Sequence, residues 1–340
     1  MQIKDKLKKS SFYTIVGLNL IFLLVSLEFF LRAYKSVTYD GLIWLKSPSV
    51  NNVIDKKLGW ISPKLRSYYK RDKVYGNGTV SYNSKGFRAP EFNKQDDWDF
   101  VVFVIGDSTM QGYQIPDGQI FSHMLEDKLR KYYKKPYVLP LAVGGYGTIQ
   151  QYLLVKEISR SIKPDLVIHH WSENDIYNNS FALERYSPSA NNMRVKPYYD
   201  LEKQEIVYKA PYIFNISPRI DSLMIVKMLN HYSRKYLIND LENSELLRLR
   251  KQSYKVTDIF IGKITRLFPS DTPKYGLYGH KGILPLYQKY GFKSVFSLVP
   301  DEMRGLPRDK HPNPQGHKYM LDSLFPKIEQ FLLKKKSNKN

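Results

Sequence analysis

Cysteine is absent from the 340 residues of this chain. Disulfide bonds, thiolate metal sites and a cysteine nucleophile are therefore excluded, and the absence fits export from the cytoplasm. Acidic residues are also scarce beside basic ones, since 32 Asp and Glu stand against 53 Lys and Arg, a formal net charge of +21. A charge of this size favours anionic partners such as nucleic acid, acidic lipid headgroups or acidic glycans.

Signatures of nucleic-acid recognition are missing as well. The chain has no zinc-finger spacing and no basic helix followed by heptads, and its Lys and Arg residues are scattered, with small clusters at the two termini. We therefore expect a solvated or membrane-facing basic surface and no nucleic-acid partner. The hydrophobic fraction of 42% and the charged fraction of 25% are ordinary for a globular protein with a core.

The first 35 residues indicate a membrane anchor. Residues 1–11 contain four Lys and one Asp, and residues 12–31, FYTIVGLNLIFLLVSLEFFL, are nearly all apolar. This run is long enough to cross a hydrocarbon layer of about 30 Å as a helix. A cleavable signal peptide would have a shorter apolar run followed by small residues of A-x-A type, which RAYKSVTYD does not supply. The excess of Lys before the span predicts a cytoplasmic N-terminus and a periplasmic or extracellular body.

Two polar residues interrupt the apolar run. Asn19 lies in its middle, and Glu28 lies one turn from its end. Glu28 and Arg32 are four positions apart, so we expect them to pair near the membrane interface.

Residues 32–97 are interpreted as a juxtamembrane stalk that wraps onto the following domain. Apolar runs then alternate with amphipathic stretches, which predicts an α/β domain over residues 98–335. The expected strands are 99–108, 137–143, 164–171 and 293–300, and the expected helices are 121–133, 148–162 and 314–333. This pattern is typical of a parallel sheet with short crossovers. Because of Pro140, we expect the second strand to lie at an edge of the sheet or to end near this proline. Between about 176 and 275 the alternation is lost, and we interpret this range, including a loop at 187–200, as an insertion over the carboxyl ends of the strands.

The first candidate for chemistry is Gly106-Asp107-Ser108, where an apolar strand leads directly into a helix. Carboxyl ends of parallel strands carry the reactive groups in α/β folds. On its own, however, the tripeptide is more typical of a simple turn.

A base and an acid follow near the other end of the chain, in RDKHPNPQGH (308–317). A serine hydroxyl needs a base within hydrogen-bond reach, and that base needs a carboxylate to orient it. His311 and Asp309 are of the right types, although in isolation a surface Asp-Lys-His turn is the more common explanation of these residues.

Two more strand ends carry groups that could stabilise an oxyanion. Gly144, Gly145 and Gly147 follow the second strand, and Asn174 follows the third. Bare backbone N–H groups and a side-chain amide at one sheet edge are the parts of an oxyanion hole.

In their order along the chain, Gly106-Asp107-Ser108-Thr109, the Gly145 turn, Asn174-Asp175 and the His311 segment resemble the four blocks of the SGNH (GDSL-type) serine esterase family. The stretch SYNSKGFRAPEF (81–92) and the anchor resemble a membrane-anchored branch of that family. The resemblance implies a flavodoxin-like three-layer fold, Ser108 as nucleophile and His311 as base. It also implies an oxyanion hole formed by the N–H groups of Ser108 and Gly145 and the side chain of Asn174.

One position departs from the family pattern. The usual Asp-x-x-His spacing would require Asp at 308, where this chain has Arg308, and Asp309 stands instead at Asp-x-His spacing. Some polysaccharide-modifying relatives use that spacing too. The orienting acid is therefore Asp309 or Asp301, or the site works as a Ser–His pair aided by a backbone carbonyl.

The remaining polar and aromatic candidates have structural explanations. Adjacent His169 and His170 point to opposite faces of a strand, which favours packing, and His317 is expected to bond locally. His123 and His280 lack further ligands at metal spacing, so we expect no metal and no other cofactor. Packing is the simpler role for three aromatic residues that could also stack on sugars: Trp171, Tyr198 and Tyr199.

The sequence thus predicts a membrane-anchored serine ester hydrolase. Its expected substrate is an O-acyl group, most simply acetyl, on an envelope glycan or lipid, in association with envelope polysaccharide machinery. An O-acyltransferase on the same scaffold and a non-catalytic glycan-binding or assembly protein are the alternatives.

Overall fold

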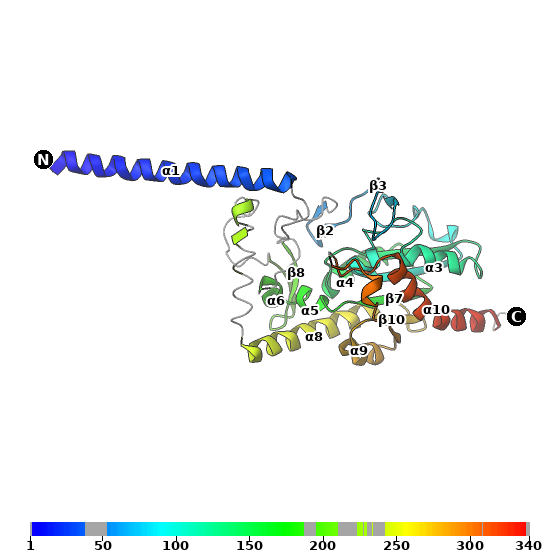
Figure 1. Ribbon diagram of the computed structural model, residues 1–340. Coiled ribbons are helices and arrows are strands. Elements are labelled where there is room, and N and C mark those ends of the chain that lie inside the picture. The colour runs from blue at the N-terminus through cyan, green and yellow to red at the C-terminus, as the bar shows by residue number, and fades with distance from the viewer. Residues whose placement is uncertain are drawn as a thin grey trace. The chain divides into compact units, whose positions relative to one another are not determined.

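The computed structural model describes residues 2–37, 53–186, 195–209, 223–226, 228–229, 233, 242–307 and 309–337. The chain divides into two compact units, one formed by residues 1–50, 185–188 and 212–241, and the other by residues 51–184, 189–211 and 242–340. The elements, drawn in Figure 1, are α1 (Gln2–Val37), β1 (Val53–Asp55), β2 (Gly59–Ile61), β3 (Arg66–Lys70), β4 (Gly78–Tyr82), β5 (Phe100–Gly106), α2 (Ser108–Gln111), α3 (Phe121–Leu129), β6 (Pro136–Ala142), α4 (Thr148–Ile158), β7 (Leu166–Trp171), α5 (Asp175–Asn178), α6 (Phe181–Tyr186), β8 (Lys196–Asp200), β9 (Glu205–Lys209), α8 (Asn243–Thr265), β10 (Lys274–Tyr278), α9 (Leu284–Lys289), β11 (Lys293–Phe296) and α10 (Pro314–Ser337).

A five-stranded parallel sheet forms the centre of the second unit. Its strand order is β11-β10-β7-β5-β6, and every neighbouring pair is parallel. Numbered by their order in the chain, the strands run 5-4-3-1-2, which is the flavodoxin-like doubly wound order. The predicted fold class is therefore confirmed, and the first strand of the sheet, β5, lies at the point where the winding reverses.

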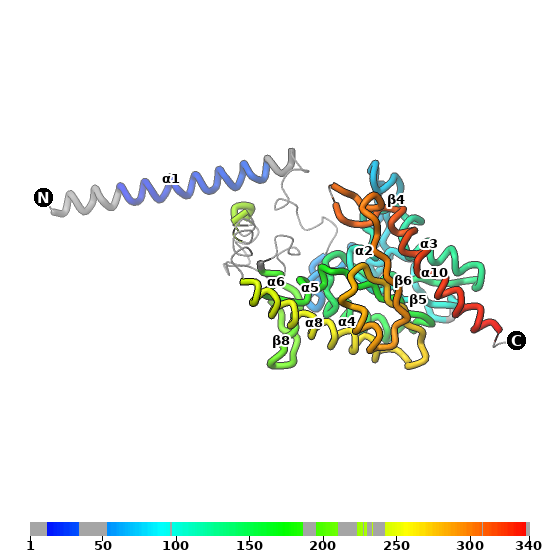
Figure 2. The backbone as a smooth tube through the Cα atoms, turned by 60° about the horizontal axis from the view of Figure 1, so that its bottom comes forward, coloured from blue at the N-terminus to red at the C-terminus, as the bar shows by residue number. Residues whose placement is uncertain are grey.

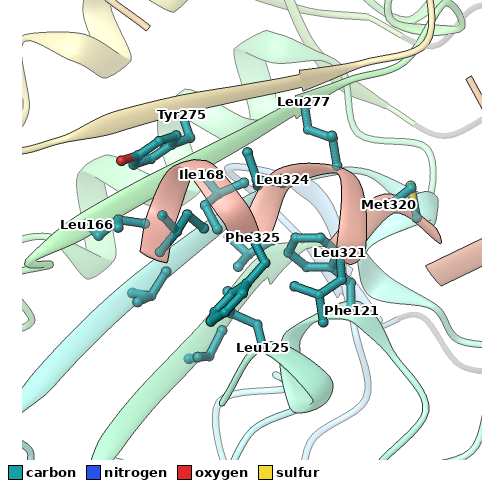
Figure 3. Packing of buried hydrophobic residues seen from close by; sticks show 14 of the residues in the cluster. Phe121, Leu125, Leu166, Ile168, Tyr275, Leu277, Met320, Leu321, Leu324 and Phe325 are labelled. Atoms are coloured by element: carbon teal, nitrogen blue, oxygen red, sulfur yellow. The ribbon is translucent and has the colours of Figure 1, made fainter. Parts of the chain in front are cut away.

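Helices cover both faces of this sheet, which makes three layers. The continuous apolar run of β5 reflects this, because a strand buried on both faces needs no polar side. Val102 and Val104 pack with residues of α3 and α10, whereas Val101, Phe103 and Ile105 pack with residues of α4 and α8. Figure 3 shows Leu324 and neighbouring residues of α10 against the sheet, and Figure 2 shows α3 beside α10 on that face.

Strand β6 forms one edge of the sheet. Pro140 lies inside it, as the edge position allows, and Pro136 begins it. Between the two prolines, the backbone N–H of Val138 donates to Glu126 Oε2 at 3.2 Å. Burial raises the pKa of Glu126, although this backbone hydrogen bond and Arg130 act in the opposite direction.

The insertion expected at 176–275 is too wide. Strand β10 begins at Lys274 and lies between β7 and β11 in the central sheet. Helix α8 buries Phe260 and Ile264 and packs on α4, so it belongs to a sheet-covering layer. The other described elements of this range are α5, α6, the β8–β9 hairpin and the helical residues 224–226 and 228–229. Most of the loop expected at 187–200 lies outside the described residues.

Residues 53–97, the described part of the expected stalk and wrap beyond α1, contain two small antiparallel pairs, β1–β2 and β3–β4. Trp60 of β2 is completely buried and donates its indole N–H to the carbonyl oxygen of Gly144 at 2.9 Å. This segment therefore packs against the turn that follows β6, and residues 38–52 lie outside the described part.

Helix α1 contains one stretch, Phe12–Ala33, that is long and apolar enough to cross a membrane. Its side chains are largely exposed, with Phe22 at 70%. The predicted anchor at 12–31 lies within it. Arg32 and Glu28 form the expected pair, with 2.7 Å between Arg32 Nε and Glu28 Oε1.

Candidate active site

Three residues predicted from the sequence meet at the carboxyl end of β5. His311 Nε2 lies 2.7 Å from Ser108 Oγ, although the two residues are 203 positions apart. On the other side of the ring, His311 Nδ1 lies 2.5 Å from Asp309 Oδ1. A hydroxyl, an imidazole and a carboxylate are thus hydrogen-bonded in series, which is the arrangement that activates a serine nucleophile.

Ser108 owes its position to a tight strand-to-helix turn. Asp107 precedes α2 and accepts the N–H of Thr109 at 3.0 Å, which caps the helix. Gly112 ends α2 in the left-handed conformation, with a φ of 56°, and donates its N–H to the carbonyl oxygen of Ser108. The N–H of Ser108 opens the helix and so has no acceptor within it.

Arg88 supports α2 from the other end. Its guanidinium is 1% exposed and donates to the carbonyl oxygen of Gly112 and, at 2.6 Å, to Asp117 Oδ1. The preceding turn is held by Asn83 Oδ1, which accepts the N–H of Phe87 at 2.9 Å. Gly86 has a φ of +85°, and a Cβ there would lie 2.8 Å from the backbone oxygen of Ser62. The SYNSKGFR stretch thus places a buried cation under the helix that carries Ser108.

Asp309, rather than Asp301, contacts His311. Gln114 Nε2 donates to Asp309 Oδ2 at 2.9 Å, so both carboxylate oxygens are bonded. Burial alone would raise the pKa of Asp309, but the hydrogen bonds from the side chain and backbone of His311, the electrostatic interaction with that residue and the hydrogen bond from Gln114 hold it well below its usual range. Asp309 is therefore ionised at neutral pH. Asp301 is 84% exposed and lies 3.6 Å from Arg304.

Asn174 reaches the same sheet edge from the end of β7. Its Nδ2 donates to Asp107 Oδ2 at 3.0 Å, and Ser172 Oγ donates to Asp107 Oδ1 at 3.1 Å. The amide is thus tied to the turn that holds Ser108. Because an amide nitrogen carries two hydrogens, the bond to Asp107 leaves one for a second acceptor.

The glycine turn after β6 lies against Ser108. A Cβ built on Gly144 would be 3.7 Å from Ser108 Cβ, and the N–H of Gly144 donates to Gln111 Oε1 at 2.8 Å. Gly145 follows with a φ of +79°, a conformation that side-chain-bearing residues rarely adopt. The sequence singled out Gly145, but Gly144 is the residue placed directly beside the Ser108 side chain.

A buried polar cluster lies behind the end of β7. Asp175 is completely buried, and its Oδ2 accepts from Gln151 Nε2 at 3.5 Å. Burial, reinforced by the nearby charge of Asp107, raises the pKa of Asp175 well above its usual range, which favours the neutral form of the carboxyl. The ring of His169 bonds Tyr287 Oη at 2.8 Å and Gln151 Oε1 at 3.0 Å. Burial lowers the pKa of His169 to about 3, and its expected packing role is confirmed.

His317 differs from its expected role. Its Nδ1 accepts the N–H of Phe121, at the start of α3, at 3.0 Å, so its bond is long-range rather than local. Burial lowers the pKa of His317 to about 3, which keeps it a neutral acceptor. His170 lies on the Asp107 side of β7, opposite His169, with Nδ1 3.3 Å from Ser172 Oγ.

Packing also explains the three aromatic candidates. Trp171 is fully buried and stacks on Tyr254, and Tyr198 is 2% exposed and donates to Glu184 Oε2 at 2.8 Å. Tyr199 packs edge-on against Phe260. Within the described ranges, no group of three or more His, Asp or Glu side chains could hold a metal ion.

Comparison with known proteins gave only remote structural matches. No family model and no curated protein matches the chain. Among solved structures, AlinE4, an SGNH-hydrolase family esterase, is 15% identical, with 71% of this chain and 99% of that one covered and a TM-score of 0.34. A variant of Axe2, an acetyl xylan esterase from Geobacillus stearothermophilus, is 11% identical, with 68% and 95% covered and a TM-score of 0.37. TesA is 11% identical, with 68% and 98% covered and a TM-score of 0.34.

Proposed function

We propose that this chain is a membrane-anchored serine ester hydrolase. The observation that carries the proposal is the hydrogen-bonded series Asp309–His311–Ser108 at the carboxyl end of β5. A serine with only a structural role would not require a hydrogen bond from its hydroxyl to an imidazole that is itself hydrogen-bonded to an ionised carboxylate.

The reaction follows from this geometry in two steps. Ser108 Oγ attacks the ester carbonyl carbon while His311 Nε2 accepts the hydroxyl proton, and Asp309 stabilises the imidazolium that forms. The alcohol leaves with that proton, and an acyl group remains on Ser108. Water then attacks the acyl-enzyme with His311 again acting as base, which releases the acid and restores the hydroxyl.

Oxyanion stabilisation is assigned to three donors. They are the N–H groups of Ser108 and Gly145 and the second amide hydrogen of Asn174. The positions of these residues support the assignment. Ser108 opens α2, Gly145 follows Gly144 in the turn next to Ser108, and Asn174 donates to the capping residue Asp107.

The proposed substrate is an O-acyl group, most simply acetyl, on an envelope glycan or lipid. Two features support it. The stretch Phe12–Ala33 would anchor the chain in a single pass with residues 1–11 in the cytoplasm and the second unit in the periplasm or outside the cell. The net charge of +21 would favour an anionic polymer or surface. Cleavage of long-chain esters alone would argue against this substrate class.

The first experiment measures hydrolysis of a short-chain chromogenic acetyl ester by the full chain in detergent. We expect Ser108→Ala and His311→Ala each to lower kcat by roughly a thousandfold or more. Ser67→Ala is the matched control, because that hydroxyl lies on β3 and bonds only at the surface, to Ser81. Undiminished activity of Ser108→Ala, or failure of a fluorophosphonate to label Ser108 in the folded protein, would contradict the proposal.

Product analysis separates hydrolysis from acyl transfer, because an acceptor hydroxyl could replace water at the acyl-enzyme. Adding oligosaccharide acceptors should leave free acid as the main product. Preferential appearance of acylated oligosaccharide would instead identify an O-acyltransferase with the same nucleophile.

A further inference from the structure

A helical segment from the middle of the sequence packs on α1. Residues 224–226 and 228–229 are helical and belong to the same compact unit as α1. Met224 and Leu31 bury one another and are 3% and 7% exposed, with Met228 packed alongside. Figure 1 shows this short yellow-green helix near the carboxyl-terminal part of α1.

Glu28 joins the two helices through the backbone. Its carboxylate accepts the N–H of Met224 at 2.9 Å and the N–H of Ile225 at 3.0 Å. Arg32 Nε donates to the same carboxylate at 2.7 Å, which balances its charge. The first N–H groups of a helix have no acceptor within it, so Glu28 supplies acceptors that the short helix itself lacks.

The position of Glu28 sets the depth of this contact. Glu28 stands five residues before Ala33, the last residue of the apolar stretch. At 1.5 Å per helical residue, it lies about 7.5 Å inside the end of that stretch. A backbone N–H without an acceptor at such a depth would cost several kcal/mol. This accounts for a carboxylate within an otherwise apolar run.

We infer that residues 223–226 and 228–229 belong to a second membrane-contacting element, a short helical segment whose exposed Leu229 side chain meets lipid acyl chains at the outer boundary of the hydrocarbon layer. The inference rests on the proposed anchoring by α1. Its described side chains are apolar: Leu223, Met224, Ile225, Val226, Met228 and Leu229; Lys227, which lies among them in the sequence, is outside the described residues. Leu229 is 50% exposed, and Phe29 and Phe30, next to Glu28 on α1, are 75% and 61% exposed, so both helical elements present apolar side chains to their surroundings.

The apolar side chains of this segment are better accommodated by lipid than by water. In sequence, the segment is followed by Arg234 and Lys235, which suit the anionic headgroups found directly above the acyl chains. A short helix with apolar side chains towards lipid and its backbone satisfied by Glu28 fits that boundary.

The absence of cysteine allows a direct test with single labels on the full chain. Leu229→Cys is labelled with an environment-sensitive fluorophore and reconstituted in vesicles of phosphatidylcholine and phosphatidylglycerol. Phe22→Cys reports the centre of α1, and Leu65→Cys, whose side chain is 75% exposed in the second unit, reports water. We expect quenching at position 229 by lipids carrying a shallow spin label, quenching at 22 by deep spin labels, and quenching at 65 by aqueous iodide alone.

The two proposals fail in different ways. Iodide quenching at 229 equal to that at 65, with 22 still quenched by deep labels, would overturn the second contact and leave the anchor intact. Iodide quenching at 22 would overturn the anchor itself. Glu28→Leu should shift the label at 229 towards iodide, whereas Asn19→Leu should not, because the Asn19 amide bonds only Ile15 of its own helix. Equal responses of the two variants would remove the role given to Glu28.

Discussion

Asp309 has both carboxylate oxygens occupied, one by His311 and one by Gln114. An amide at this position would keep the shape but would present an N–H or a neutral oxygen to the imidazole. We expect Asp309→Asn to lower kcat/KM by on the order of 10³–10⁴-fold with little change in fold. Asp301→Asn is the control and should leave hydrolysis of the acetyl ester unchanged, because Asp301 is 84% exposed. Loss of activity in Asp301→Asn but not in Asp309→Asn would identify Asp301 as the orienting acid.

Replacing Arg88, whose guanidinium is buried, should also disturb the position of Ser108. Its guanidinium donates to the carbonyl oxygen of Gly112, at the end of α2, and to the carboxylate of Asp117. Arg88→Met leaves that carbonyl and that carboxylate without their partner, at a cost of about 3–5 kcal/mol in the free energy of unfolding. Urea denaturation measures this cost, and kcat should fall even where the variant is fully folded. Arg248→Met, which breaks a surface pair with Glu245, should change stability by less than about 1 kcal/mol.

At the level of the elements, Asp175 in the turn from β7 to α5 should make the free energy of unfolding depend on pH. Burial raises the pKa of this carboxyl, so the folded chain keeps a proton that the unfolded chain releases above about pH 3.9. The contribution of the neutral carboxyl to stability is therefore full below pH 3.9 and is lost as the pH rises towards the folded pKa. The loss is at most about 1.4 kcal/mol per pH unit.

Asp175→Asn removes this titration while keeping the size of a neutral acid. We expect the variant to unfold at a higher urea concentration than the parent chain at pH 7, with the difference shrinking to nothing near pH 4. A difference that stays constant with pH would mean that Asp175 does not change its protonation on folding.

For the molecule as a whole, the sequence was informative where a signal is local. The strands β5, β6 and β7 lie in largely apolar runs bounded by turn residues, which predict them, and β11 occupies the first half of the strand expected at 293–300. Strand β10 was missed because KYGLY is short, begins with a charge and has a glycine at its centre. Helix α8 was assigned to an insertion because its apolar face is hidden among basic residues, and only packing on α4 reveals its layer.

The candidate site divides in the same way. Ser108, Asp309 and His311 stand in short stretches whose residue types already indicate their chemistry. Arg88 and Gln114 gave no such sign, because their partners lie 24 and 195 positions away and are brought near only by the fold. The hydrogen bond between Glu28 and Met224 has the same origin, since these two residues are 196 positions apart.

Under the proposed membrane anchoring, the outer edge of β6 affects how copies of this protein would behave when crowded in one membrane. Pro136 and Pro140 lack an N–H, and the N–H of Val138 between them is held by Glu126. Over these five positions the strand therefore offers a neighbouring copy almost no outward donor from which a continuous intermolecular ladder could start. Diffusion in two dimensions raises the rate of encounter between copies, yet an edge closed in this way resists fusion into extended sheets.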